Sequence, residues 1–266
     1  MSGLPAGDQT RTALVDLHCH VLPAVDDGAV SLGEALAMLR EAVDAGICLV
    51  VATPHSDRCP PESARAAVAE LRAQAAAAGL GVELAVGAEY PLDAELMPAW
   101  QAGRVLPLAG SAYLLVELRA GFFWSPAVSD LLYRLQLEGA IPVLAHPERI
   151  PAVQQDPSLL EPLARSGIVL QVNAGSLLGR YGSRVRRTVE TLVECDLAHI
   201  VASDAHRVGE LCELPQALDR IAELVGQETR QAMIARAQQI ARGLPVDLPE
   251  PRSRRRRPLL VRWFRR

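Results

Sequence analysis

The chain alternates short apolar runs with polar residues and with longer helical patterns. Seven apolar runs each stop at a polar residue or cluster, and a loop and often a helical pattern follow. The polar ends are His18-Cys-His20, Thr53-Pro-His55, Ala88-Glu89, Val116-Glu117, Ala145-His146-Pro-Glu-Arg149, Val172-Asn173 and Ser203-Asp-Ala-His206. Runs bounded in this way predict strands, and strands separated by helices predict parallel pairing in an α/β fold.

The helical stretches begin and end at residues typical of helix termini. Ser31 and Glu34 form a capping box for a helix to about Ala45, with Gly46 beyond it. An alanine-rich helix is expected over 62–78, and Ser125-Pro126 opens another that runs to Gly139. Further helices are expected over 184–194, 215–225 and 228–242. Their leucines and valines predict core packing rather than chemistry.

The polar ends of the strands carry the candidate chemistry. In a closed parallel barrel, the carboxyl ends of all strands open on one rim, where active sites collect. Five of the six histidines stand at these ends, whereas His199 begins the seventh run and should lie at the opposite end as a structural residue. His18 and His20 are two apart on an extended strand and therefore point the same way. Imidazoles on one rim with Glu89, Glu117 and Asp204 favour metal binding over isolated corner histidines.

Length and proline usage suggest how the chain is divided. A chain of 266 residues is long enough for one large domain or two small ones. Pro245, Pro249 and Pro251 mark the end of the last helical pattern. We expect an N-terminal extension over 1–13, a catalytic domain over 14–244 and a basic, flexible tail over 245–266.

Charge is distributed unevenly. Eight arginines follow Glu250, so 19 basic residues stand against 31 acidic ones in residues 1–250, which carry −12 although the whole chain carries −4. Residues 252–266 interleave arginine with leucine, tryptophan and phenylalanine, a mixture that suits an anionic membrane surface. The acidic domain argues against a nucleic-acid partner. A solvated tail with no partner is the equal alternative.

Several features predict a cytoplasmic protein. No window approaches the roughly 18 uninterrupted apolar residues of a membrane span, and residues 1–10 lack the basic start and apolar core of a secretory signal. Five scattered cysteines make a disulfide framework improbable.

One cysteine has the spacing of another enzyme class. Cys59 and Arg65 stand in the C-x5-R spacing of thiol-based tyrosine phosphatases. A phosphate-binding loop needs several backbone N–H groups, but Pro60 and Pro61 have none and Glu62 repels an anion. We therefore interpret this stretch as a loop that leads into a helix.

The ordered set of motifs resembles a known family. It consists of Asp16-Leu-His-Cys-His20, Asp26-Asp27-Gly28, Thr53-Pro-His55, Gly87-Ala-Glu89, His146-Pro-Glu-Arg149 and Ser203-Asp-Ala-His206. In this order the motifs resemble the PHP-superfamily phosphatases, and more narrowly the bacterial capsule and exopolysaccharide tyrosine phosphatases. The resemblance covers about residues 14 to 240 and implies a distorted seven-stranded (β/α)7 TIM-like barrel.

The resemblance also implies a site for three divalent metal ions, with manganese expected and iron or zinc as alternatives. His18, His20, Glu89 and Asp204 would hold one ion, and Glu89 would bridge to a second ion held by Glu117 and His146. Asp27, His55 and His206 would hold the third. Such ions can clamp phosphoryl oxygens and deprotonate a water, so that hydroxide attacks the phosphorus.

Substrate contacts are expected around this site. Arg149 follows His146 and is the candidate for clamping the phosphate, with a salt bridge to a carboxylate such as Glu148 as the alternative. The family has a second arginine where this chain has Leu211, and Arg207 is the nearest candidate. Phe123 and Tyr181 could flank a phenyl phosphate or simply anchor loops. The glycine-rich stretch 173–182 could move as a lid or form a tight turn.

The hypothesis from the sequence is a metal-dependent phosphotyrosine-protein phosphatase. The resemblance implies that its substrate is a tyrosine kinase of polysaccharide assembly at the inner membrane surface. One alternative is a small-molecule phosphatase of the same superfamily, for example one that acts on histidinol phosphate. The other is a catalytically silent module that keeps metals for structure and docks through its tail.

Overall fold

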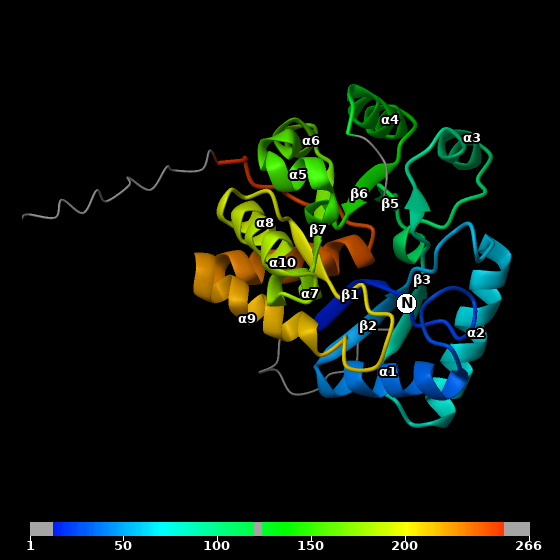
Figure 1. Ribbon diagram of the computed structural model, residues 1–266. Coiled ribbons are helices and arrows are strands. Elements are labelled where there is room, and N and C mark those ends of the chain that lie inside the picture. The colour runs from blue at the N-terminus through cyan, green and yellow to red at the C-terminus, as the bar shows by residue number, and fades with distance from the viewer. Residues whose placement is uncertain (1–12, 120–123, 253–266) are drawn as a thin grey trace, which may run out of the picture.

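Eight parallel strands form the centre of the molecule (Figure 1). The computed structural model describes residues 13–119 and 124–252. One sheet contains β1 (Leu14–Cys19), β2 (Ile47–Ala52) and β3 (Glu83–Val86) in that order. The other contains β4 (Tyr90–Pro91), β5 (Tyr113–Glu117), β6 (Ile141–Ala145), β7 (Val169–Asn173) and β8 (Ile200–Ala202) in chain order.

Backbone hydrogen bonds close the two sheets into a barrel. Between β1 and the end of β8, Asp204 N–H donates to His18 O at 2.9 Å and His20 N–H donates to Ala205 O at 2.9 Å. On the other side, a parallel bridge joins His55, which follows β2, to Glu89, which directly precedes β4. The seven apolar runs correspond to β1, β2, β3 and β5 to β8, and β4 is an additional two-residue strand. The expected distorted α/β barrel is confirmed.

Helices surround the barrel. Six of them lie within two residues of the predicted positions: α1 (Leu32–Asp44), α2 (Pro61–Ala77), α4 (Pro126–Leu137), α8 (Ser183–Glu194), α9 (Glu213–Val225) and α10 (Gln227–Ala241). The sequence did not indicate the short helices α3 (Leu96–Gln101), α5 (Pro151–Gln155), α6 (Glu161–Arg165) and α7 (Ala174–Leu178). Ser31 Oγ accepts the Glu34 N–H at 3.2 Å, and the Glu34 carboxylate accepts from Val30 N–H at 2.9 Å. The expected capping box is therefore present, except that the Glu34 carboxylate accepts from the N–H of Val30 instead of the N–H of Ser31.

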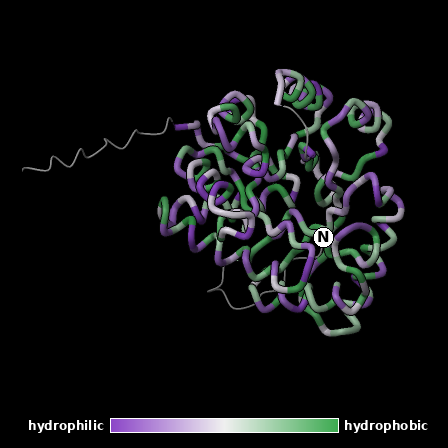
Figure 2. The backbone as a smooth tube through the Cα atoms, viewed as in Figure 1, coloured by the Kyte–Doolittle hydropathy of each residue, from purple (hydrophilic) through white to green (hydrophobic). Residues whose placement is uncertain are grey.

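Strand alternation divides the core into two clusters. On β5, Tyr113 and Leu115 point into the barrel, whereas Leu114 and Val116 pack in the cluster beneath the helices. Figure 2 shows hydrophobic and hydrophilic positions alternating along the outer helices, as expected for helices with one buried face. Among the described residues, no helix is long and apolar enough to cross a membrane.

The C-terminal segment lies along the end of the barrel opposite the carboxyl ends of the strands. Residues 245–252, which the sequence assigned to the tail, pack there: Arg236 donates to Asp247 O at 2.8 Å, and Arg252 N–H donates to Cys195 O at 2.9 Å. The tail after Arg252 lies outside the described residues. His199, just before β8, is fully buried and accepts the Leu170 N–H at 3.0 Å, as expected for a structural histidine. Burial lowers its pKa to about 3.

Candidate metal centre

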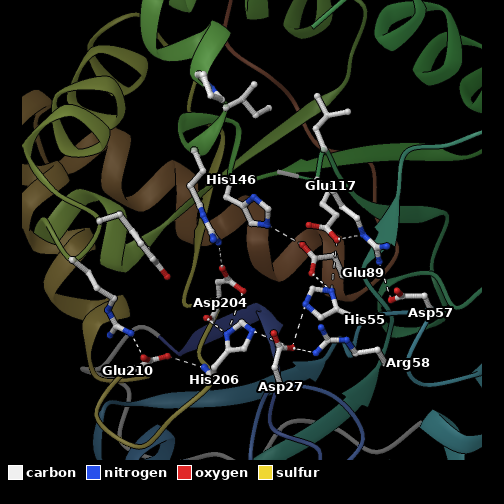
Figure 3. Close-up of a pocket in the computed structure, with 17 residues that line it drawn as sticks. Asp27, His55, Asp57, Arg58, Glu89, Glu117, His146, Asp204, His206 and Glu210 are labelled. Carbon is white, nitrogen blue, oxygen red and sulfur yellow. Dashed lines mark hydrogen bonds and ion pairs between the residues drawn. The ribbon is translucent and has the colours of Figure 1, made fainter. Parts of the chain in front are cut away.

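All nine predicted metal ligands lie at the carboxyl end of the barrel, and Figure 3 shows those that line the pocket there. His18 is on β1 and His20 follows it, while Glu117 is the last residue of β5. Glu89 lies between β3 and β4, His146 follows β6, and Asp204 and His206 follow β8. The remaining two, Asp27 and His55, lie on the loops after β1 and β2. Parallel pairing thus brings together residues that are far apart in the chain.

The deepest group is buried and mixes nitrogen with oxygen donors. His18 Nε2 lies 3.2 Å from Asp204 Oδ1 and 3.5 Å from Glu89 Oε1. His20 Nε2 lies 3.5 Å from Asp204 Oδ1 and 3.6 Å from Glu89 Oε2. All four side chains are at most 3% exposed. His18, His20 and Glu89 form one candidate group of ligands, and Asp204 groups with His18 and His146.

Glu89 connects this group to its neighbours. His146 Nε2 lies 2.8 Å from Glu89 Oε1, and His55 Nδ1 lies 3.0 Å from Glu89 Oε2. Glu117 groups with His55 and Glu89, whereas His146 groups with His18 and Asp204. The side chains therefore place Glu117 and His146 on opposite flanks of the Glu89 carboxylate.

A fourth group lies closer to solvent. Asp27 Oδ1 is 3.4 Å from His55 Nε2 and 3.8 Å from His206 Nε2, and His20 completes the group. His206 Nδ1 donates to Asp204 O at 2.9 Å, which leaves Nε2 as the lone-pair donor. This geometry suits the cation contact expected for these residues.

Buried polar residues orient the deepest histidines. His18 Nδ1 contacts Gln171 Oε1 at 2.9 Å, Gln171 donates to Asn173 Oδ1 at 2.8 Å, and Asn173 donates to Asp204 Oδ2 at 2.6 Å. On the other side, His20 Nδ1 contacts Asp26 Oδ2 at 2.7 Å. A donor contact through Nδ1 fixes the tautomer that presents Nε2 to an ion.

The sequence analysis gave Gln171 no role in the site. The only feature that could have pointed to Gln171 is that it is a polar residue within the apolar run of β7. Asn173 stood in the expected cluster, but its link to Asp204 depends on the tertiary structure.

The carboxylates favour the protonated forms of His18, His20 and His146 when no cation is present. Burial disfavours the His18 imidazolium, but the Glu89 and Asp204 carboxylates outweigh this effect and raise its pKa to about 9. Against the same burial, hydrogen bonds to Asp204 and Asp26 raise the pKa of His20. Conversely, the hydrogen bond and charge of His20 outweigh burial and lower the pKa of Asp26 to about 2. A cluster that attracts protons this strongly also favours divalent cations.

Backbone conformation at the site is constrained. His146 and Asp204 have positive φ values of 36° and 52°, an uncommon conformation for residues other than glycine that occurs most often at functional sites. The Asp-Asp-Gly motif needs a glycine at position 28, because a Cβ on Gly28 would lie 1.9 Å from His20 O. The loop therefore approaches His20 as closely as its backbone allows.

Seven of the nine predicted metal ligands, all except His18 and His20, form the floor of a cavity of about 760 Å³. Arg149 and Tyr181 both line it, as predicted. The Arg149 guanidinium lies 4.8 Å from the Tyr181 ring centroid, and its Nη1 is 3.2 Å from Asp204 Oδ2. Glu148, the expected alternative partner of Arg149, is instead buried and accepts the Asn173 N–H at 3.0 Å. Arg149 is thus directed toward the floor of the cavity.

The second predicted arginine is placed differently. Arg207 Nη1 donates to the carbonyls of Asp27, Gly28 and His206, and Arg207 does not line the cavity. These contacts hold two loops together, so the structure does not support a phosphate contact for Arg207. Leu211 is fully buried in the core. Sequence analysis missed three arginines that line the cavity: Arg58, Arg119 and Arg180.

Other expected features take different forms. Phe123 lies outside the described residues. Within the stretch 173–182, expected as a lid or a tight turn, Ala174–Leu178 form α7 with Ala174 to Leu177 buried, and residues 179–181 form a turn. Cys59 is buried, and burial together with the Asp26 charge raises its pKa, which is the wrong direction for a thiolate nucleophile. Arg65 does not line the cavity.

The donor set fits divalent cations. Six carboxylates and four arginines line the cavity, so with neutral histidines the lining carries −2 and would repel a phosphate dianion. Among the described residues, four groups of His, Asp and Glu each bring nitrogen and oxygen donors within 4.8 Å of one another, and none contains a soft thiolate, as hard or borderline divalent ions prefer. Bound cations would reverse the sign of the charge that an anionic substrate meets.

Comparisons with known proteins agree with this geometry. Residues 14–241 match the family described as capsular polysaccharide synthesis, CpsB/CapC. The tyrosine-protein phosphatase YwqE of Bacillus subtilis is 33% identical over 252 residues, which are 92% of this chain and 98% of YwqE. The tyrosine-protein phosphatase CpsB of Streptococcus pneumoniae is 29% identical over 80% of this chain and 91% of its own length.

Solved structures show the same fold. One comes from work on YwqE of Bacillus subtilis and CpsB of Streptococcus pneumoniae, described as unique metal-dependent tyrosine phosphatases. It superposes with a TM-score of 0.86 at 32% identity, covering 90% of this chain and 98% of that one. A TatD-family hydrolase from Entamoeba histolytica shares only the fold, with a TM-score of 0.56 at 8% identity over 86% of this chain and 98% of that one.

Proposed function

The chain belongs to the CpsB/CapC family of capsular polysaccharide synthesis, and from that premise we infer that it is a metal-dependent tyrosine-protein phosphatase of the CpsB/YwqE type. The observation that carries this inference is the convergence of imidazole and carboxylate groups on the floor of one cavity. Metal binding needs neutral histidines, and the four arginines that line the cavity then leave its six carboxylates in excess, so bound cations are what would make the cavity favourable for a phosphate ester.

The proposed ligand set is the one that the family resemblance implies. His18, His20, Glu89 and Asp204 hold the deepest ion, and Glu89 is shared with a second ion held by Glu117 and His146. Asp27, His55 and His206 hold a third. The contacts of Glu89 with His146 Nε2 at 2.8 Å and with His55 Nδ1 at 3.0 Å support the sharing of Glu89 between two ions. Manganese is the proposed metal, with iron or zinc as alternatives.

When bound, the ions supply an activated water and neutralise the charge on the transferring phosphoryl group. The residues of the chain do the rest. Gln171 and Asp26 keep the Nε2 lone pairs of His18 and His20 directed into the cluster. Asn173, through its 2.6 Å bond to Asp204 Oδ2, holds that carboxylate in position.

Arg149 is the proposed phosphate clamp. Its guanidinium already lies against a carboxylate of the floor, and a phosphate can replace that contact with two parallel hydrogen bonds. Tyr181 lies beneath the guanidinium and fixes its plane, and its ring also offers a wall for a phenyl group. Because tyrosinate has a pKa near 10, its departure needs less help from a general acid than an alkoxide does.

The substrate is a phosphotyrosine protein. We assign it more narrowly to a tyrosine kinase of polysaccharide assembly, and place the enzyme in the cytoplasm near the inner membrane surface. The family description and the mixture of arginine with apolar residues in 252–266 support this placement. Residues 253–266 of that stretch lie outside the described residues.

The small-molecule alternative gives a different substrate profile. A superfamily member that acts on histidinol phosphate would release phosphate faster from histidinol phosphate than from a phosphotyrosine peptide. The docking-module alternative predicts no phosphate release from either substrate, with partner binding unchanged when manganese is added. Parallel assays of the two substrates distinguish all three functions.

Metal removal and two substitutions test the proposal. We expect chelation and His20→Ala each to abolish phosphate release from a phosphotyrosine peptide, because both remove a cation from the floor of the cavity. Cys59→Ser should leave turnover within about twofold of the unmodified enzyme, because the buried thiol does not line the cavity and the exchange of sulfur for oxygen changes the side chain little. Turnover that survives chelation but is lost in Cys59→Ser would instead establish a thiol mechanism.

A further inference from the structure

The geometry points to Arg119 as a second phosphate-binding residue, which acts on the opposite side of the cavity from Arg149. This inference rests on the proposed function, because it concerns the substrate of the same site. Arg119 lies two residues beyond Glu117, on the loop that follows β5. It lines the cavity, and its side chain is 44% exposed.

The guanidinium of Arg119 is held between the floor and the rim. Its Nε donates to Glu117 Oε1 at 3.2 Å, and its Nη2 lies 2.8 Å from Asp57 Oδ1. Glu117 is a proposed metal ligand, so a phosphoryl oxygen near the second ion would also lie near this guanidinium. Asp57 belongs to none of the metal-ligand groups among the described residues.

The two arginines approach the floor from different directions. Arg149 reaches Asp204, whereas Arg119 reaches Glu117 and Asp57. Figure 3 shows Glu117 and Asp57 on one side of the pocket and Asp204 on the other. A phosphate between them could therefore accept hydrogen bonds from two planar guanidinium groups, which would fix its orientation for attack by water.

Asp57 occupies the place that a phosphate oxygen would take. Its carboxylate is 47% exposed, so its ion pair with Arg119 is solvated and weak. A dianion on the floor of the cavity can displace it, while the Arg119 Nε keeps its bond to Glu117. The guanidinium is thus oriented before the substrate arrives.

The other arginines near the cavity are less suitable. Arg180 is paired with Glu210 and Glu213, whose side chains are each only 19% exposed, so neither carboxylate is as easily replaced as the 47% exposed Asp57. Arg58 contacts Asp27, a proposed metal ligand, through one atom pair at 3.2 Å and is 51% exposed. Arg207 donates to three backbone carbonyls. Among the described residues, Arg119 best combines a fixed guanidinium with a replaceable anion.

The test is product inhibition of the metal-loaded enzyme by inorganic phosphate. We expect Arg119→Ala to raise both the inhibition constant for phosphate and KM for a phosphotyrosine peptide by about 10- to 100-fold, the range for a lost hydrogen bond to a charged group. Arg119→Lys should recover part of this loss, because it keeps the charge but not the planar pair of donors. The matched control is Arg134→Ala, an exposed arginine of α4 that does not line the cavity.

Metal content and the unmodified enzyme separate the possible failures. The inference requires that Arg119→Ala bind as much manganese per chain as the unmodified enzyme. The inference would be overturned if Arg119→Ala left the inhibition constant for phosphate unchanged. It would also be overturned if a loss of manganese explained the rise in that constant, because Arg119 would then only hold Glu117 in place. If the unmodified enzyme fails to hydrolyse the peptide, the proposed function is wrong, whatever Arg119 does.

Discussion

Close contacts with the backbone restrict which residues fit around the proposed metal centre. Gly28 lies against the backbone of His20, and Ala29 N–H donates to His20 O at 3.1 Å. Asp26, two residues earlier, accepts from His55 N–H at 3.1 Å through the same oxygen that contacts His20. One short loop thereby sets the positions of two proposed ligands from different strands. Any side chain at Gly28 must disturb both.

Gly28→Ala tests this close approach. The added Cβ would lie 1.9 Å from His20 O and 2.6 Å from His20 Cβ, so His20 must move. We expect a loss of about 1 to 3 kcal/mol in the free energy of unfolding, as for other overpacked sites, together with weaker manganese binding. Thermal unfolding and metal content per chain measure the two effects.

Gly33→Ala is the matched control for Gly28→Ala. Only Ser31 Oγ, at 3.8 Å, lies within 4 Å of a Cβ at Gly33, which is in the first turn of α1. This substitution should leave metal binding unchanged and stability equal or slightly higher. If the two variants behave alike, the loop does not constrain His20 in the way described.

At the scale of elements, the sequence predicted the helix ends that depend on neighbouring residues, but not the short elements that depend on tertiary contacts. Gly46, Gly79 and Gly139 adopt positive φ just after α1, α2 and α4, so the predicted ends of these three helices are confirmed. Helices α5 and α7 have five residues each, too few for a hydrophobic period to be visible. The two-residue strand β4 exists because Tyr90 pairs with Val116, a tertiary contact without a local pattern.

The metal centre was predictable for a related reason. All proposed ligands except Asp27 stand at or just after the end of a strand, and parallel strands bring such ends to one rim. The supporting contacts were not predictable, because Gln171 meets His18 across 153 positions of the chain. Arg119 and Arg207 show the same limit, since only the tertiary structure shows which carboxylate or carbonyl each guanidinium meets.

For the whole molecule, the metal-free protein and the metal-bound protein should respond to pH in opposite ways. The unfolded pKa of His18 is near 6.5, and the folded pKa without cations is about 9. Its contribution to stability is therefore fully present below pH 6.5 and is lost as the pH rises through 9. Cations bind to the deprotonated imidazole, so stabilisation by manganese should grow over the same interval.

Thermal unfolding between pH 6.5 and 9 measures this linkage. We expect the chelated protein to lose roughly 2 to 3 kcal/mol of stability over the interval, and the increase in Tm with manganese to be largest at the alkaline end. In the chelated His18→Gln variant, this dependence should weaken. A chelated protein whose Tm is constant or rises over the interval would refute the electrostatic description of the site.

The most direct measurement is anomalous diffraction from crystals of the protein grown with manganese. The proposed ligand set predicts three anomalous peaks inside the cavity, with one in contact with His18 and His20 and another in contact with Asp27, His55 and His206. Anomalous peaks confined to the surface, or an active crystalline enzyme with no peak beside His18 and His20, would contradict it.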